Sequence, residues 1–163
     1  MHKDDPLAAA IGNVTINLAY LESLIDEMLM SWAGIVDYDI TNIIMGHTDL
    51  SQKLTMLKGV GFLRKPSDEW FERLRAEVTT IEKLREKRNR AIHDLWSPGD
   101  DSRNWKRIRS GVFLKRLQSR QPLQLTTIER TPVDVDEVWA LADEIARMTT
   151  TLMLLDDEIP EPC

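Results

Sequence analysis

The sequence predicts an all-α fold, mainly an antiparallel bundle of four to five helices, with a small loop or β-hairpin inserted before the last helix. Apolar residues recur at alternating steps of three and four through three long segments, which is the period of an α-helix. Residues typical of helix starts precede those segments. The chain has 163 residues, of which 42% are hydrophobic. That length suits a single domain over residues 1–163, with a flexible tail at residues 159–163.

The first helix is expected over residues 6–33. Asp5 can cap its first turn, Pro6 suits the first helical position, and Gly34 is typical of a helix end. Its apolar positions are Leu7, Ile11, Val14, Leu18, Leu21, Ile25, Met28 and Trp32. We interpret this stripe as facing the bundle core, although an unbroken stripe would also suit pairing between two copies of the chain.

Two further helices are expected before the insert. Residues 37–46 indicate a short helix or turn, and the Asp49 to Gln52 spacing is that of a capping box, so a helix should run to about Leu63. A long helix should follow Pro66 and end near Ser97-Pro98-Gly99. Two arginines interrupt its otherwise apolar line, which consists of Phe71, Leu74, Val78, Ile81, Arg85, Arg88, Ile92 and Leu95.

The insert and the last helix follow. Residues 100–131 contain two runs that favour β-structure, at residues 112–114 and 123–128, and predict short strands or a hairpin. Asp134 and Glu137 then have capping-box spacing. The last helix carries apolar residues at helical spacing: Val138, Leu141, Ile145, Met148, Leu152 and Leu155.

Charge is distributed unevenly along the chain. The formal net charge of −6 argues against a general nucleic-acid binder. Residues 83–120, however, hold twelve Lys and Arg against four Asp and Glu, which leaves this segment at +8 and the remainder at −14. A basic region of this kind can attract a polyanion locally, although a solvated charged face has the same composition.

The sequence favours a cytoplasmic protein with no membrane association. Its start lacks the pattern of a signal peptide, and no apolar run approaches the roughly 20 residues of a membrane span. The only cysteine is Cys163, so no internal disulfide is possible. We expect no metal and no cofactor, because the three histidines stand far apart and no HExxH sequence or cysteine pair occurs.

The strongest functional signal is the segment Arg88-Asn89-Arg90-Ala91-Ile92-His93. A guanidinium on an apolar line is costly unless it has a partner or a task. Its donors match phosphate oxygens, an imidazole can transfer a proton near neutrality, and an amide can orient either group. Together they suffice for metal-free RNA cleavage, in which the 2′-hydroxyl is an internal nucleophile, or for binding a nucleotide without cleaving it.

These residues could form a shared site or could have a purely structural role. His93 lies about 140° around an ideal helix from Arg88, so the two converge only if the helix end loosens or a second chain closes the site. In a purely structural interpretation, Arg88 pairs with a carboxylate such as Glu22 or Asp26 of the first helix. His93 is then favoured by the negative end of the helix dipole.

Arg88-Asn89-x-x-x-His93 resembles the Arg-Asn-x-x-x-His motif of the HEPN (higher eukaryotes and prokaryotes nucleotide-binding) superfamily. Residues 81–94 are similar to that family's third-helix segment. The long opening helix, with Tyr20 and Trp32, is similar to that of small bacterial members. The likeness of the motif covers this short segment, and the likeness of the helical layout covers most of the chain.

The resemblance implies a helical bundle that forms homodimers with both motifs facing one cleft. It implies a metal-independent endoribonuclease of the kind found in toxin–antitoxin, abortive-infection, phage-defence and CRISPR systems, and an antitoxin partner protein if the chain is a toxin. Arg88 would stabilise the phosphate, His93 would be the acid–base group, and Asn89 would orient them. Other members bind nucleotides or partner proteins without catalysis. A structural helical interaction protein is the third alternative.

Basic and aromatic residues near the motif are candidates for RNA binding: Arg85, Arg90, Trp96, Arg103, Lys106 and Arg107. Trp96 and Trp105 flank the motif and the basic insert, where an indole can stack on a base. Packing in a core is the commoner role of tryptophan, and it is the role we expect for most of the five: Trp32, Trp70, Trp96, Trp105 and Trp139.

Overall fold

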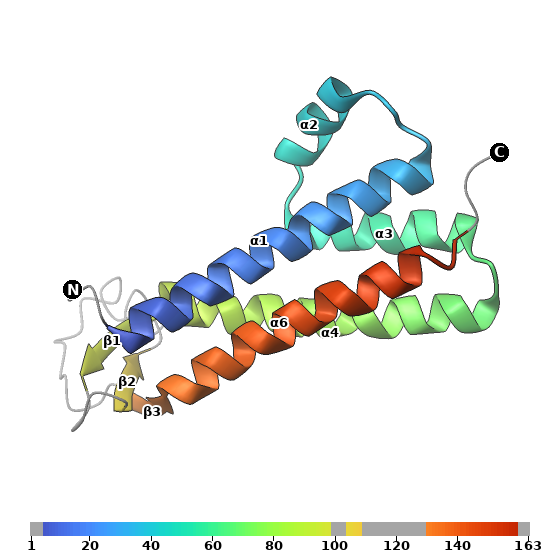
Figure 1. The fold of residues 1–163 in the computed structure, drawn as a ribbon. Coiled ribbons are helices and arrows are strands. Elements are labelled where there is room, and N and C mark those ends of the chain that lie inside the picture. Colours follow the sequence, from blue (N-terminus) through green and yellow to red (C-terminus); the bar gives the residue numbers. More distant parts are fainter. Residues whose placement is uncertain (1–4, 99–103, 109–129, 160–163) are drawn as a thin grey trace, which may run out of the picture. The chain divides into compact units, whose positions relative to one another are not determined.

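The computed structural model of the chain describes residues 5–98, 104–108 and 130–159 (Figure 1). These residues form five helices: α1 (Pro6–Ala33), α2 (Tyr38–Gly46), α3 (Leu50–Arg64), α4 (Asp68–His93) and α6 (Val135–Asp156). They also form three strands: β1 (Leu95–Pro98), β2 (Asn104–Ile108) and β3 (Arg130–Asp134). The predicted mainly helical class is confirmed.

The chain divides into two compact units. The first unit comprises Met1–Thr15 and Arg85–Asp143, and the second comprises Ile16–Leu84 and Glu144–Cys163. Helices α1, α4 and α6 therefore each contribute residues to both units. The single domain over residues 1–163 stays a prediction.

The ends of α1 form as the sequence predicts. The carboxylate of Asp5 accepts a hydrogen bond of 3.0 Å from the backbone N–H of Leu7, which satisfies one of the free donors of the first turn. At the other end Gly34 has a φ of 70°. The next residue, Ile35, donates its N–H to the carbonyl of Met30 at 3.0 Å. A positive φ at this position favours glycine, so local chemistry sets where α1 stops.

The shorter helices are capped in the same manner. Asp37 caps α2, and its carboxylate accepts from the backbone N–H of Ile40. Asp49 and Gln52 form the complete predicted capping box at the start of α3. Asp134 accepts a 3.0 Å bond from the N–H of Asp136 at the start of α6. Aspartate therefore starts these helices by pairing with free backbone donors.

The second unit has a core with tryptophan at its centre. The rings of Trp32 and Trp70 pack edge to face with centroids 5.7 Å apart. The indole nitrogen of Trp32 donates 2.7 Å to the Asp156 side chain, and that of Trp70 donates 3.0 Å to the carbonyl of Leu155. Both indoles thus find acceptors at the end of α6, which ties that end to α1 and α4.

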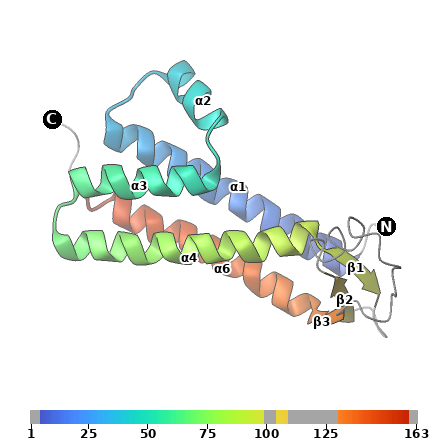
Figure 2. The same ribbon diagram turned by 180° about the vertical axis from the view of Figure 1, so that it is seen from behind.

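Helix α3 runs alongside the part of α4 that belongs to the second unit (Figure 2). Gly61 of α3 faces Leu74 of α4 so closely that a side chain at Gly61 would collide with it. No space is left here for a Cβ atom. The lack of a side chain at Gly61 therefore allows α3 to pack closely against α4.

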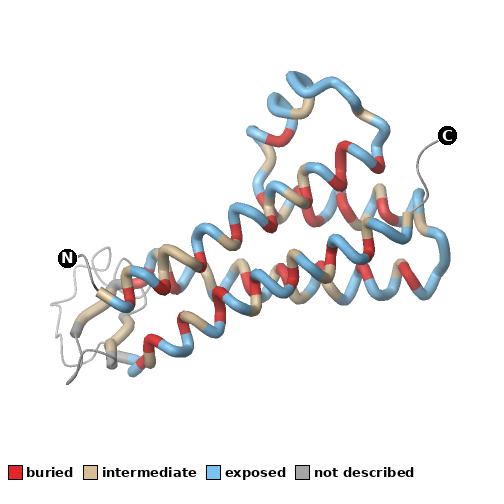
Figure 3. Tube along the Cα trace, viewed as in Figure 1, coloured by how far each residue is buried: buried red, intermediate tan, exposed pale blue. Residues whose placement is uncertain are grey.

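Buried and exposed residues alternate along the helices, as a helix with one packed face requires (Figure 3). The buried line of α4 differs from the predicted one. It consists of Trp70, Leu74, Val78, Ile81, Leu84 and Ala91. Arg88 stands four residues after Leu84 and three before Ala91, so it continues this line, and it is half-buried with a buried Nε, as expected for a guanidinium that faces packed surface. Arg85 is also half-buried but lies beside the line. Leu84 takes the place in the core that the spacing had given to Arg85.

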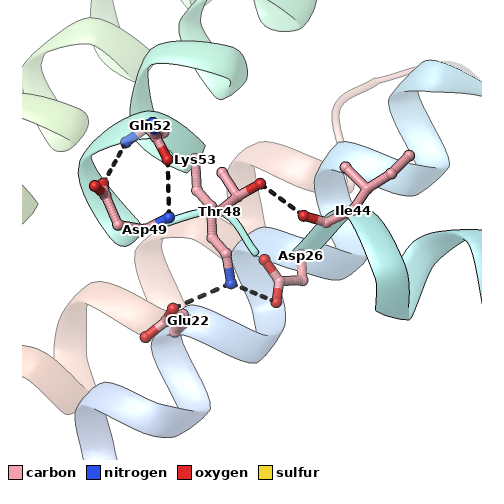
Figure 4. A network of polar contacts seen from close by, with 7 residues as sticks. All are labelled: Glu22, Asp26, Ile44, Thr48, Asp49, Gln52 and Lys53. Atoms are coloured by element: carbon pink, nitrogen blue, oxygen red, sulfur yellow. Dashed lines mark hydrogen bonds and ion pairs between the residues drawn. The ribbon is translucent and has the colours of Figure 1, made fainter. Parts of the chain in front are cut away.

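A buried ionic cluster joins α3 to α1. Lys53 is only 4% exposed, and its ammonium group lies between two carboxylates, 3.0 Å from Glu22 and 2.8 Å from Asp26 (Figure 4). Burial alone would lower the pKa of Lys53, but hydrogen bonds to Asp26 and Glu22 outweigh it and hold the pKa above its ordinary value. Lys53 is therefore charged in the folded protein at neutral pH.

The three strands form one antiparallel sheet in the order β1-β2-β3. This corrects the expectation that α4 continues to Ser97, because the helix ends at His93 and residues 95–98 form β1. Leu95 follows Ile92 at a step of three, which suits a helix and a strand equally. Trp96 favours a strand, and the residue before Pro98 is disfavoured in a helix. The strands predicted at residues 112–114 and 123–128 lie outside the described residues.

Candidate functional site

The three motif residues lie in the last two turns of α4, within the first unit. Arg88 is half-buried, whereas Asn89 and His93 are exposed. His93 is the final residue of the helix, and the sheet begins only two residues later. The imidazole therefore stands at a helix end that solvent can reach.

Arg88 and Asn89 interact directly. The guanidinium Nη1 of Arg88 donates a hydrogen bond of 3.1 Å to Oδ1 of Asn89. The Nε of Arg88 is buried and has no hydrogen-bond partner. Asn89 therefore restricts the guanidinium from one side, and the Nη donors that it does not use are the ones that could meet a ligand, since the Nε is closed to solvent.

No carboxylate pairs with Arg88 within the described part of the chain. Glu22 and Asp26, the partners that a purely structural interpretation required, bind Lys53 instead. Partial burial of a cation without an anion costs free energy, and an anionic ligand at Arg88 would offset that cost.

Arg85 resembles Arg88 in its surroundings. It lies three residues earlier on the same helix, is also half-buried, and its Nε is likewise buried without a partner. Side chains three residues apart on a helix are neighbours. Arg85 and Arg88 therefore form an arginine pair on one side of α4.

The end of α4 is closed by the following strand. The indole nitrogen of Trp96 donates 2.9 Å to the carbonyl of Ala91, and the N–H of Asp94 donates 3.1 Å to the carbonyl of Arg90. Carbonyls of the last turn have no partner within a helix. Trp96 satisfies one of them, so it acts first as a cap for the helix that carries His93.

Arg107 of β2 pairs with the buried carboxylate of Asp94, at 3.6 Å between Nε and Oδ2. Asp94 directly follows His93, so this contact joins β2 to the end of α4. The exposed fraction of the Arg107 side chain is only 25%. Its predicted contact with RNA stays a prediction, but the structure gives Arg107 a second task in positioning the helix end.

Neighbouring basic residues of β2 point to opposite faces of the sheet. In the antiparallel register Trp96 lies opposite Arg107, and Ser97 lies opposite Lys106. Side chains alternate between faces along a strand. Arg107 therefore shares a face with Trp96, while Lys106 is on the other, and the two cations do not form one patch.

The other candidates for RNA binding differ in how far solvent reaches their side chains. Arg90 is exposed on α4, and Trp96 and Lys106 are half-buried. Arg103 lies outside the described residues. Sequence reasoning missed Asp94 and the capping role of Trp96, because both depend on the strand that follows the helix and that strand was not predicted.

Two cavities lie within the second unit. One, of about 390 Å³, opens between α1 and α6 and is lined by residues that include Tyr20 and Met153. The other, of about 520 Å³, lies beside the start of α3 and is lined by residues that include His47 and Ser51. Neither of these two cavities is lined by motif residues, which lie at the end of α4 in the first unit.

Within residues 5–98, 104–108 and 130–159, no group of three His, Cys, Asp or Glu side chains is placed to bind a metal ion. Among the described helices α1 alone is long and apolar enough to cross a membrane, although a core helix meets the same criterion. The sequence had predicted no such segment. Leu21 and Ile25 of this helix are fully buried in the protein.

Comparisons with protein-family models, with curated proteins and with solved structures found no match. The resemblance to the HEPN superfamily therefore depends on the motif residues and on the helical layout alone.

Proposed function

We propose that this chain is a metal-independent endoribonuclease of the HEPN type, with Arg88, Asn89 and His93 at its active site. One observation carries the proposal. The guanidinium of Arg88 is held by Asn89, has no carboxylate partner among the described residues, and shares the end of a helix with an exposed imidazole. Such a set offers a phosphate a fixed cation and a group that can transfer a proton near neutrality.

The reaction follows from the chemistry of RNA. The 2′-oxygen attacks the adjacent phosphorus and forms the 2′-O–P bond, and the P–O5′ bond breaks. The products are a 2′,3′-cyclic phosphate and a free 5′-hydroxyl. Arg88 would stabilise the negative charge that develops on the phosphoryl oxygens, and His93 would take or supply the proton.

Two proton transfers are needed, and each chain supplies one His93. A homodimer in which two copies of His93 meet would provide both the base and the acid. This is the assembly that the family resemblance implies. A cytoplasmic toxin or phage-defence component, with an antitoxin as partner protein, is the setting we propose for such an enzyme.

The test is cleavage of single-stranded RNA in EDTA by the wild type, H93A and R88A. We expect cleavage by the wild type only, with cyclic phosphate ends on the products. H47A is the matched control, because His47 is exposed and belongs to the second unit. Equal cleavage by the wild type and H93A, or none by either, would contradict the proposal. Cleavage that EDTA abolishes would contradict the metal-free mechanism.

A second candidate is a non-catalytic module that binds a nucleotide. The arginine pair favours it, since neither guanidinium has a carboxylate partner among the described residues, and a guanidinium binds an anion whether or not a reaction follows. Thermal stabilisation by a nucleotide, lost in R88A while RNA stays intact, would support it.

A third candidate is a protein-interaction module. Helix α2 and the residue before its cap leave large apolar side chains in water, with Val36 100%, Tyr38 76% and Ile43 65% exposed. Apolar surface of this kind is typical of interaction sites. Loss of oligomerisation in Y38S/I43S, with RNA untouched by the wild type, would support this function over the ribonuclease.

A further inference from the structure

The arginine pair of α4 consists of two like charges on adjacent turns. Arg85 and Arg88 are both half-buried, and the Nε of each is buried without a hydrogen-bond partner. Neither forms an ion pair with any residue that the structure describes. Like charges at this spacing repel each other, and half-burial strengthens the repulsion because less water screens it.

Bound anions would offset the repulsion between the two positive charges. Among the described residues, the side-chain hydrogen bond that the pair makes is the one from Arg88 to the neutral amide oxygen of Asn89. It removes no positive charge. The buried Nε of each arginine is closed to solvent, but its Nη groups are not among the buried unpaired atoms and can meet an oxyanion. Two charges side by side call for two anionic groups at a similar spacing.

We propose that the arginine pair binds two successive phosphates of one single-stranded RNA. Arg88 holds the phosphate that reacts, and Arg85 holds its neighbour. The inference rests on the proposed function for the role of Arg88, and it adds the substrate class: a single strand of at least three nucleosides, bound through its backbone. Residues three apart on a helix have Cβ atoms about 5–6 Å apart, and long arginine side chains can span the step between phosphates.

The contacts would be independent of base sequence. Phosphate contacts position a strand and carry no sequence information. They also make affinity depend on salt, with a slope of about 0.7 in log–log form for each phosphate of a single strand. Arg85 therefore has a measurable signature that a purely structural arginine lacks.

The experiment uses binding rather than cleavage. The probe is a 2′-O-methyl trinucleotide, which has two phosphodiesters and no nucleophile. It is compared with two versions in which one linkage is a neutral methylphosphonate. For the wild type we expect each neutral linkage to weaken binding about tenfold. In R85Q one of the two linkages no longer matters, and in R88Q the other no longer matters.

Lys83→Gln is the matched control, because Lys83 is exposed on the same helix and its substitution removes one positive charge, as R85Q does. It should leave both linkage effects at their wild-type size. If K83Q weakens the linkage effects as much as R85Q, the pair is part of a general basic surface and the proposal fails. If R85Q retains both effects, the proposal also fails.

Arg85→Lys covers the case in which R85Q does not fold. Lysine keeps the charge but lacks the fork of donors, so the effect of the neutral linkage should become smaller than in the wild type. An unchanged effect would overturn the proposal. The outcomes also separate the two claims. Linkage effects without cleavage of ordinary RNA refute the ribonuclease alone, and cleavage with no role for Arg85 refutes the two-phosphate site alone.

Discussion

The indole nitrogen of Trp96, in β1, donates a hydrogen bond to the backbone carbonyl of Ala91, in the last turn of α4. The bond is 2.9 Å long and closes the helix two residues before it ends at His93. Trp96, for which the sequence left base stacking and packing both open, thus caps the helix turn that carries the motif.

Trp96→Phe should lower the free energy of unfolding by about 1 kcal/mol, because the carbonyl of Ala91 loses its partner. Trp105→Phe is the matched control, since the indole nitrogen of Trp105 has no hydrogen-bond partner to lose. Urea unfolding of both variants measures the difference. An equal loss of stability in both would show that the hydrogen bond contributes nothing beyond the packing of the ring.

Lys53→Met should destabilise the protein by about 2–3 kcal/mol, because it leaves Glu22 and Asp26 close together without their cation. The value is below that of a fully buried pair, since both carboxylates are partly exposed. Lys58→Met is the control. Its pair with Glu82 is longer, at 3.7 Å, and about a third of its side chain is exposed, so its loss should cost less than about 1 kcal/mol. Equal effects would contradict this account.

The same cluster predicts how stability responds to alkaline pH. The folded-state pKa of Lys53 is raised above its ordinary value of 10.5, so the stabilisation from its charge is fully present below that pH. It is lost as the pH rises through the folded-state pKa. The difference in unfolding free energy between wild type and K53M should therefore be constant near neutrality and shrink above about pH 10.5. A constant difference throughout would refute the assignment.

Gly61→Ala and Gly59→Ala should have opposite effects, although both lie in α3. A Cβ at Gly61 would collide with the buried Leu74 and lie 3.3 Å from the ring of Trp32. Overpacking of this kind costs about 1–3 kcal/mol. Nothing lies within 4 Å of a Cβ at Gly59, so G59A should gain up to about 1 kcal/mol from helix propensity. Thermal unfolding of both variants gives the comparison.

Asn89→Ala should reduce RNA cleavage about tenfold, mainly in kcat, because the guanidinium of Arg88 is then less well oriented for the reacting phosphate. Asn42→Ala, at an exposed position of α2, should leave activity unchanged. If N89A raises KM and leaves kcat intact, Asn89 binds substrate rather than orienting Arg88.

Local chemistry explains which parts of the fold the sequence could predict. Asp5, Gly34 and the Asp49–Gln52 box act within a few residues of their own position, so their spacing is enough to place helix ends. The end of α4 depends on β1 folding back, and a spacing of three residues at Leu95 suits a helix equally well.

The candidate site was predictable in its residues but not in its surroundings. The motif spacing placed Arg88, Asn89 and His93 on one helix, where the structure has them. The partners of Glu22 and Asp26 could not be read from the sequence, because Lys53 lies 31 and 27 residues away and its ion pairs depend on how helices pack. The same holds for Leu84, which displaced Arg85 from the buried line.

The five tryptophans are divided between the units, with Trp32 and Trp70 buried in the second and Trp96, Trp105 and Trp139 half-buried in the first. The indoles of the two units therefore differ in how readily solvent reaches them. A soluble quencher such as acrylamide will reach the half-buried indoles of the first unit more readily than the buried edge-to-face pair. Ligand titrations followed by quenching can locate an oligonucleotide without any label.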